Sequence, residues 1–196
     1  MSPEEARQQI LQMERPARDA FWMGLAFYLS VMSHDSETKN GAVIINNLTS
    51  RILGTGFNGF PMGCRDEELP QTRPDKYLYI QHAERNAVLS VTQPCSDATL
   101  YCTMEPCEGC VGTILNQSLL YGASKGKSGV TRLVYWEERP NEAARLMLSH
   151  HPEIKVEQYY NPMLPTDVLR MVQMYCQLRP LDGLYKDGVA SNYSHQ

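Results

Sequence analysis

The pattern of apolar and polar positions at the start of the chain predicts a helix followed by a β-hairpin. After Pro16, a residue favoured in the first turn of a helix, apolar side chains recur at helical spacing at Phe21, Leu25, Leu29 and Met32. We therefore expect a helix over residues 16–33 whose apolar face packs on a core. The β-branched run at 42–45 and the segment 51–57, joined by two asparagines, predict a pair of strands.

Helices and strands alternate along the rest of the chain. A loop rich in glycine, proline and charge covers residues 58–76. Beyond it the pattern predicts helices at 82–91, 107–120, 141–149 and 166–177, and strands at 98–103, 131–136 and 154–160. This order is typical of an α/β fold, a three-layer α-β-α domain around a mixed five-stranded sheet. We expect a single domain over 1–196, with a catalytic core at about 16–160 and a C-terminal helix and loose tail at 161–196.

Composition and charge narrow the class of protein. With 196 residues, 42% of them hydrophobic, the chain can bury a substantial core. A net charge of -4 disfavours binding to long nucleic acid, which depends on cationic phosphate contacts, and favours a small-molecule partner. The sequence has no leader pattern and no apolar stretch long enough to span a membrane, so we expect a soluble cytoplasmic protein without a membrane partner. Six unevenly spaced cysteines favour reduced thiols and metal binding over disulfides.

Two short motifs carry the candidate chemistry. His82-Ala83-Glu84 is followed, 24 positions after its histidine, by Pro106-Cys107-Glu108-Gly109-Cys110. One imidazole and two thiolates would give Zn²⁺ three protein ligands and leave the fourth position open, as in catalytic rather than structural zinc sites. This pairing is the known signature of the zinc-dependent nucleobase deaminases. A Cys-x-x-Cys pair on its own is equally typical of a structural zinc or redox site.

The spacing of these residues suits a hydrolytic deamination. Cys107 and Cys110 share one face at the start of a predicted helix, whose free N–H groups and dipole stabilise thiolates. Zinc lowers the pKa of a bound water toward about 7. Glu84 lies two residues from His82. It would take the proton of this water, pass it to N3 of a cytosine ring and then protonate the leaving amino group to give ammonia.

A longer stretch upstream resembles the deoxycytidylate (dCMP) deaminase family. It comprises Gly-Phe-Asn-Gly-Phe-Pro-Met-Gly-Cys at 56–64, Asp-Glu-Glu-Leu-Pro at 66–70 and Lys-Tyr-Leu-Tyr at 76–79, just ahead of His82. The resemblance extends over about 35–135. It implies zinc-dependent hydrolysis of dCMP to dUMP and ammonia, with zinc on His82, Cys107 and Cys110 and with Glu84 as the catalytic proton shuttle.

The resemblance also implies which residues bind nucleotides. It assigns the substrate to Asn58, Arg73, Lys76, Tyr79 and Ala83, and an effector site to Gly56, Phe57, Asn58 and Gly59. Asn58 would bond the sugar or base, and Arg73, Lys76 and Tyr79 would lie near the 5′-phosphate. Two alternatives remain open, namely that Asn58 is a turn residue and that the other three are solvated surface positions.

Regulation and assembly follow from the same resemblance. It implies a homo-oligomer, often a hexamer, that dCTP activates and dTTP inhibits, with Mg²⁺ accompanying the triphosphate. The sequence departs from the family at three places. Phe57 stands where the family has tyrosine, Glu105 where it has an apolar or small residue, and the stretch 116–129 is longer.

Three other functions remain possible from the sequence. A deaminase of bases within RNA or DNA predicts tight, salt-sensitive binding to oligonucleotides, against which the acidic composition counts. A nucleoside deaminase would lack a phosphate site. A zinc-stabilised binding module would unfold without metal and would not depend on Glu84.

Overall fold

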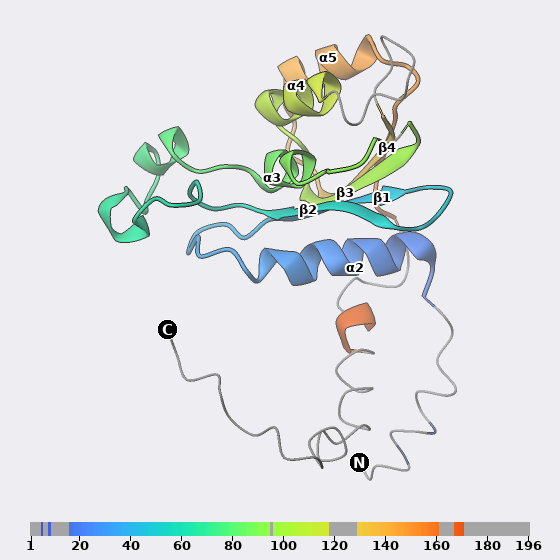
Figure 1. Cartoon of the computed structure of the whole chain (residues 1–196), viewed down its shortest axis with the longest axis horizontal. Helices are drawn as coiled ribbons and strands as arrows, with labels where there is room; N and C mark the ends of the chain where they lie inside the picture. Colours follow the sequence, from blue (N-terminus) through green and yellow to red (C-terminus); the bar gives the residue numbers. More distant parts are fainter. Residues whose placement is uncertain are drawn as a thin grey trace.

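The computed structural model describes residues 5, 8, 16–94, 96–117, 129–160 and 167–170. Its helices and strands alternate much as the sequence predicts (Figure 1). The helices are α2 (Arg18–Ser30), α3 (Ala83–Leu89), α4 (Glu108–Asn116) and α5 (Glu142–Ser149). The strands are β1 (Gly41–Asn46), β2 (Ile52–Phe57), β3 (Ala98–Met104), β4 (Val130–Glu137) and β5 (Lys155–Gln158). Two short 3₁₀ helices, η1 (Asp66–Glu68) and η2 (Asp75–Leu78), lie between β2 and α3.

The five strands form one mixed sheet in the order β2-β1-β3-β4-β5. Strand β1 runs antiparallel to both β2 and β3, whereas β3, β4 and β5 are parallel. Strands β2, β3, β4 and β5 therefore all run in one direction and end at the same edge of the sheet. This finding confirms the predicted mixed five-stranded sheet, whose strand order the sequence did not reveal.

Helices cover both faces of the sheet, which confirms the three-layer α-β-α architecture. Helix α2 lies on one face, and α3, α4 and α5 lie on the other (Figure 1). The side chains of β1 show why. Val43 and Ile45 pack in the cluster on the α2 side, while Ala42 and Ile44 pack in the cluster around α3. An uninterrupted apolar run is what a strand buried on both faces requires.

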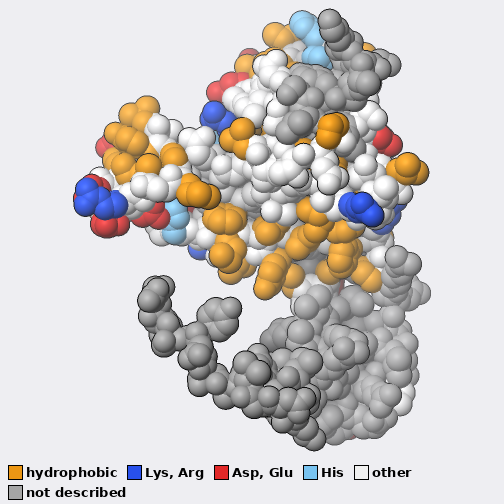
Figure 2. Space-filling model, in the orientation of Figure 1, with side chains coloured by type: hydrophobic (Ala, Val, Ile, Leu, Met, Phe, Trp, Pro, Cys, Tyr) orange, Lys and Arg blue, Asp and Glu red, His pale blue; other side chains and the backbone are white. Residues whose placement is uncertain are grey.

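Helix α2 buries a face that agrees only in part with the predicted one, since Leu25 and Leu29 pack against the core cluster but Phe21 and Met32 do not. Its buried residues are Ala20, Met23, Gly24, Ala26 and Ser30, whereas Phe21 is 42% and Met32 66% exposed. Alanine and glycine on this face let the helix approach the sheet closely, and Met23 is the large side chain buried among them. Figure 2 shows hydrophobic side chains gathered along the outer side of the helix. The prediction that the spacing of Phe21 and Met32 marks the core face was therefore wrong.

The remaining predicted elements differ from the observed ones mainly at their ends. His82 and Cys107 occupy the N-cap positions of α3 and α4 rather than their first turns. Of the predicted helix at 166–177, residues 167–170 are described and helical. Its remainder, most of the long connection at 116–129 and the tail lie outside the described residues. Within the described parts of the chain, no helix combines the length and apolarity that crossing a bilayer needs.

Helix α3 lies directly against the backbone of β2. A Cβ atom added to Gly56 would come within 2.2 Å of the Ala83 carbonyl oxygen and 2.4 Å of the Ala87 nitrogen. At Gly54 it would come within 2.3 Å of the Ala87 carbonyl oxygen. The absence of a side chain at these two positions is therefore what allows the helix to settle on the strand, and packing alone requires glycine at position 56.

We predict that Gly56→Ala destabilises the protein by about 3 kcal/mol or more, because the added methyl meets helix backbone that cannot move aside locally. The matched control is Gly112→Ala within α4, where an added Cβ meets nothing within 4 Å. That variant should stay within about 1 kcal/mol of the wild type, since alanine has the higher helix propensity. Denaturant unfolding measures both free energies, and equal effects of the two substitutions would contradict the packing argument.

Candidate active site

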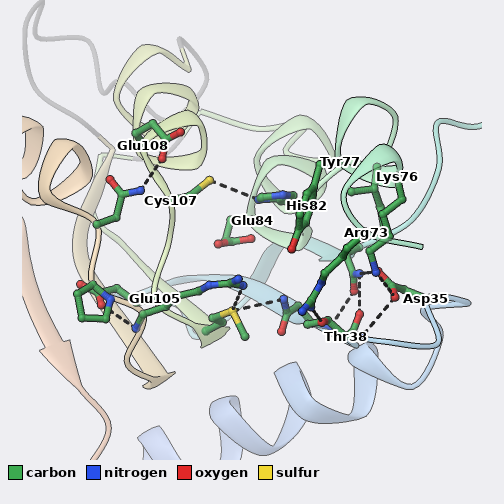
Figure 3. A pocket seen from close by; sticks show the side chains of 17 residues that line it. Asp35, Thr38, Arg73, Lys76, Tyr77, His82, Glu84, Glu105, Cys107 and Glu108 are labelled. Carbon is green, nitrogen blue, oxygen red and sulfur yellow. Dashed lines mark hydrogen bonds and ion pairs between the residues drawn. The ribbon is translucent and has the colours of Figure 1, made fainter. Parts of the chain in front are cut away.

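A cavity of about 410 Å³ opens at the edge of the sheet where β2, β3 and β4 end (Figure 3). Residues that follow these three strands line it, together with the start of α3 and the segments 35–40 and 73–80. The lining residues include Asp35, Asn58, Arg73, Lys76, Tyr77, His82, Glu84, Glu105, Cys107, Glu108 and Arg139. Ligand sites in open α/β sheets lie at this carboxyl edge of the strands.

The three predicted metal ligands lie together in space. The Nδ1 atom of His82 is 3.4 Å from Cys107 Sγ and 3.4 Å from Cys110 Sγ. Tetrahedral zinc, with Zn–N of about 2.0 Å and Zn–S of about 2.3 Å, would hold nitrogen and sulfur about 3.6 Å apart. His82 and Cys107 cap two neighbouring helices, and Cys110 follows in the first turn of α4. The geometry and the soft donors therefore fit zinc, and three ligands leave one position open.

The electrostatics of this trio favour a thiolate. A hydrogen bond with Cys110, opposed by burial and assisted by His82, lowers the pKa of the Cys107 thiol to about 3. The same hydrogen bond and burial raise the pKa of Cys110. The hydrogen bond with Cys107 raises the pKa of His82. The three groups thus share protons that a bound cation would displace.

Glu84 lies beside the trio with its carboxyl group inside the cavity (Figure 3). Its side chain belongs to the first turn of α3, and the residue is 6% exposed. Burial raises the pKa of this carboxyl above its usual range. A raised pKa brings a carboxyl group closer to the operating pH, where it can both accept and donate a proton.

Lys76 is buried, which excludes the solvated surface position left open for it. Its ammonium group donates to Asp35 Oδ1 and Oδ2 at 2.8 and 2.9 Å and pairs with Glu37 Oε2 at 2.6 Å. Lys76 is 2% exposed and Asp35 5%. These three contacts match the three hydrogens of an ammonium group. Lys76 therefore ties the loop at 35–37 to η2, and its predicted contact with a substrate phosphate would need one of these bonds to break.

Asn58 is also committed to the loop before β1. Its Nδ2 donates to Asp35 Oδ2 at 3.2 Å and to the Thr38 carbonyl oxygen at 2.9 Å. Its Oδ1 accepts the Asn40 N–H at 2.7 Å. Both amide hydrogens are used, so what remains is acceptor capacity on Oδ1, which suits a substrate hydroxyl.

The other predicted nucleotide-binding residues differ in where they lie. Arg73 lines the cavity, pairs with Glu37 and donates to Thr38, whereas Ala83 and Tyr79 are not among the lining residues. Tyr79 is 41% exposed, and Tyr77 lines the cavity in its place.

The predicted effector residues Gly56, Phe57 and Gly59 join β2 to the loop around Asn58. The backbone of Gly59 pairs with that of Gln81, so this loop is fastened to the entry of α3. Among the lining residues that sequence reasoning missed as candidates for function are Glu105 and Arg139. Their positions directly after β3 and β4 are the signal that would have found them.

Comparisons with known proteins agree with this geometry. The family profile for the cytidine and deoxycytidylate deaminase zinc-binding region matches residues 16–120. The deoxycytidylate deaminase of Pongo abelii is 32% identical over 106 residues, 50% of this chain and 59% of that protein. The human deoxycytidylate deaminase is 28% identical over 141 residues, which cover 66% of this chain and 72% of that protein. That of Mycobacterium phage D29 is 31% identical over 140 residues, covering 64% of this chain and 99% of the relative.

Among solved structures, the dCMP deaminase of cyanophage S-TIM5 in complex with dCMP and dUMP is similar. It is 25% identical, with a TM-score of 0.56, and the alignment covers 75% of this chain and all of that one. The match with the Pongo abelii deoxycytidylate deaminase spans less than two thirds of the length of that protein.

We predict that Lys76→Met costs about 3–5 kcal/mol of stability at neutral pH, because it leaves the buried Asp35 carboxylate without its cation. Burial raises the pKa of Asp35, but hydrogen bonds from Lys76 and two backbone N–H groups outweigh burial and hold it below its usual range. Burial likewise lowers the pKa of Lys76, and its two carboxylate partners more than reverse this. Urea unfolding at several pH values measures the loss.

The sign of the pH dependence follows from these two shifts. The contribution of Asp35 is present above its unfolded pKa of about 4 and disappears as the pH falls through the lower folded value. That of Lys76 is present below about 10 and disappears as the pH rises through its raised folded value. The difference in unfolding free energy between variant and wild type should therefore be largest between these limits.

The matched control is Lys155→Met, which removes an exposed ion pair with Glu157 at 2.7 Å and should change stability little. An equally small loss for Lys76→Met would contradict the prediction.

Proposed function

This chain belongs to the deoxycytidylate deaminase family of zinc-binding deaminases, and we propose that it hydrolyses dCMP to dUMP and ammonia with a bound Zn²⁺. The observation that carries the proposal is the three-ligand set of His82, Cys107 and Cys110 beside a buried glutamate in a nucleotide-sized cavity. The names of the relatives and the dCMP and dUMP bound by the cyanophage enzyme support the choice of substrate.

The reaction exchanges the amino group at C4 for an oxygen atom from water. A Zn²⁺ ion held by His82, Cys107 and Cys110 would supply Lewis acidity that brings the pKa of a water toward about 7. Glu84 accepts a proton from the attacking water and delivers it to N3 as C4 is attacked. It then takes the proton of the new hydroxyl group on C4 and passes it to the departing amino group, whose bond to C4 breaks. One water is consumed and one ammonia leaves. The burial of Glu84 supports this role, because the carboxyl group exchanges protons away from bulk solvent.

The substrate contacts remain predictions. We expect Asn58 Oδ1 to accept a hydrogen bond from a sugar hydroxyl, since its amide hydrogens are already used. Arg73, which the resemblance places near the phosphate, lines the cavity but already pairs with Glu37. Lys76 lines the cavity and is held there by Asp35, whereas Tyr79 and Ala83 are not among the lining residues.

We predict that Glu84→Gln retains one zinc per chain and the wild-type fold while dCMP turnover falls by at least about 10³-fold, because glutamine cannot shuttle protons. The control is Cys107→Ser, which should lose zinc as well as activity. Metal analysis and an ammonia-release assay measure both. A Glu84→Gln enzyme that keeps a tenth of wild-type turnover would exclude Glu84 as the shuttle, whereas a zinc-loaded wild type without any turnover would favour the zinc-stabilised binding module.

We propose further that the protein is a regulated homo-oligomer, with a hexamer expected, that dCTP with Mg²⁺ activates and dTTP inhibits. The exposed apolar side chains of Phe21, Tyr28, Val31 and Met32 around α2 support self-association, because large apolar patches mark interfaces. The loop at 56–59, with Phe57 in place of tyrosine, is the candidate effector site.

The expected kinetics follow from this proposal. The rate should depend sigmoidally on dCMP and become hyperbolic when dCTP is added, since an activator favours the competent state. Initial-rate measurements with and without dCTP and dTTP, and light scattering for the mass, test regulation and assembly separately. Hyperbolic kinetics that ignore both triphosphates would remove the effector site and leave the catalytic proposal intact.

A further inference from the structure

The described lining of the cavity contains three lysine and arginine side chains, and two of them already have anionic partners. Lys76 spends its hydrogens on Asp35 and Glu37. Arg73 lies 3.6 Å from a Glu37 oxygen and stacks over the Tyr77 ring at 5.8 Å. These two charges are therefore compensated within the protein.

Arg139 is the third cation, and within the described residues its guanidinium pairs with no carboxylate. Its one side-chain contact is a weak bond from Nη1 to the thioether of Met104 at 3.2 Å. It follows the carboxyl end of β4, while Met104 ends β3 three residues before the ligand Cys107. The charge of Arg139 is therefore available to an anion that binds in the cavity. Such an anion would lie next to the ends of β3 and β4.

The backbone of Arg139 is held in place by a buried carboxylate. Glu105 Oε2 accepts the Arg139 N–H at 2.9 Å. The Glu105 side chain is 9% exposed, and Arg145 of α5 donates to both of its oxygens, at 2.9 and 3.1 Å. Beside it, Asn141 caps α5 through the Ala144 N–H and donates to Glu108 at 2.6 Å. The loop that carries Arg139 is thus fixed to the segment that carries the zinc ligands.

We propose that Arg139 is the residue by which this enzyme recognises the 5′-phosphate of its substrate, and that Glu105 and Arg145 position it. The inference rests on the proposed deamination of dCMP and adds the residue that distinguishes the nucleotide from its nucleoside. A guanidinium offers two parallel donors that match phosphate oxygens. Because no carboxylate among the described residues pairs with the Arg139 guanidinium, pairing with phosphate breaks none of the ion pairs seen in that part of the chain.

The first test compares the kcat/KM of dCMP with that of deoxycytidine. Arg139→Met should lower the ratio of the two values by about 10- to 100-fold, the effect of losing hydrogen bonds to a charged group. Arg139→Lys should lie between Arg139→Met and the wild type, because it keeps the charge and loses the fork. Arg51→Met, which removes an exposed arginine outside the lining, is the matched control and should leave the ratio unchanged.

The second test separates positioning from general structural damage. Glu105→Gln should raise the KM for dCMP with a smaller change in kcat. In an Arg139→Met background the same substitution should have no further effect on the substrate ratio, because the residue it positions is gone. An additive effect would show that Glu105 acts on the substrate ratio independently of Arg139. Thermal unfolding and zinc content of each variant identify those that fail to fold.

The outcomes distinguish this inference from the proposed function. A wild-type enzyme that does not deaminate dCMP overturns both. A wild type that prefers dCMP, together with an unchanged ratio in Arg139→Met, overturns the inference alone and leaves Arg139 as a solvated charge. If Arg73→Met collapses the ratio while Arg139→Met does not, Arg73 holds the phosphate and the inference is likewise wrong.

Discussion

The direct contact between the backbones of β2 and α3 is the constraint on which the site depends. With Gly54 and Gly56 in the strand, the helix can lie on the sheet without intervening side chains. Its first residues are then held at the edge where β2 and β3 end, and His82 meets the two cysteines that follow β3. A helix lifted by even one methyl group would carry His82 and Glu84 away from Cys107. The geometry of this His-Cys-Cys cluster is therefore set by packing some distance from the cluster itself.

A second constraint is the cost of burying charge, and it divides the cationic residues of the cavity into two kinds. Asp35 is buried and would be expensive without a partner, so Lys76 is fully used in neutralising it. The resulting pair orders the loop that also binds Asn58. A cation so engaged supports the shape of the site, whereas one with only a thioether for a partner can respond to a ligand. Whether a cationic side chain of the cavity binds a ligand or stabilises the cavity wall therefore depends more on how many anionic partners it already has than on how close it lies to the cavity.

The sequence predicted the features that local spacing encodes and missed those that depend on distant partners. The periods of the hydrophobic pattern gave the elements, and His-x-Glu with Cys-x-x-Cys gave the metal trio, because each motif lies within one helical turn. Strand order could not be predicted, since it depends on pairing between distant segments. For the same reason Lys76 was expected at a phosphate, as its partner Asp35 lies 41 positions away. In α2 the pattern of large apolar residues misled, because small residues make the closer contact with the sheet.

Glu105 illustrates how a single departure from the expected family pattern requires changes elsewhere. A carboxylate before Pro106, where the resemblance leads us to expect an apolar or small residue, is buried and therefore needs a cation. Arg145, 40 positions later, supplies it from α5. Because Glu105 also accepts the Arg139 N–H, neutralising this charge fixes the loop after β4 relative to the loop that carries Cys107. The groups that would act on the base and the arginine that would bind the phosphate are thereby linked through Glu105, which pairs with the half-exposed Arg145 and accepts the Arg139 N–H.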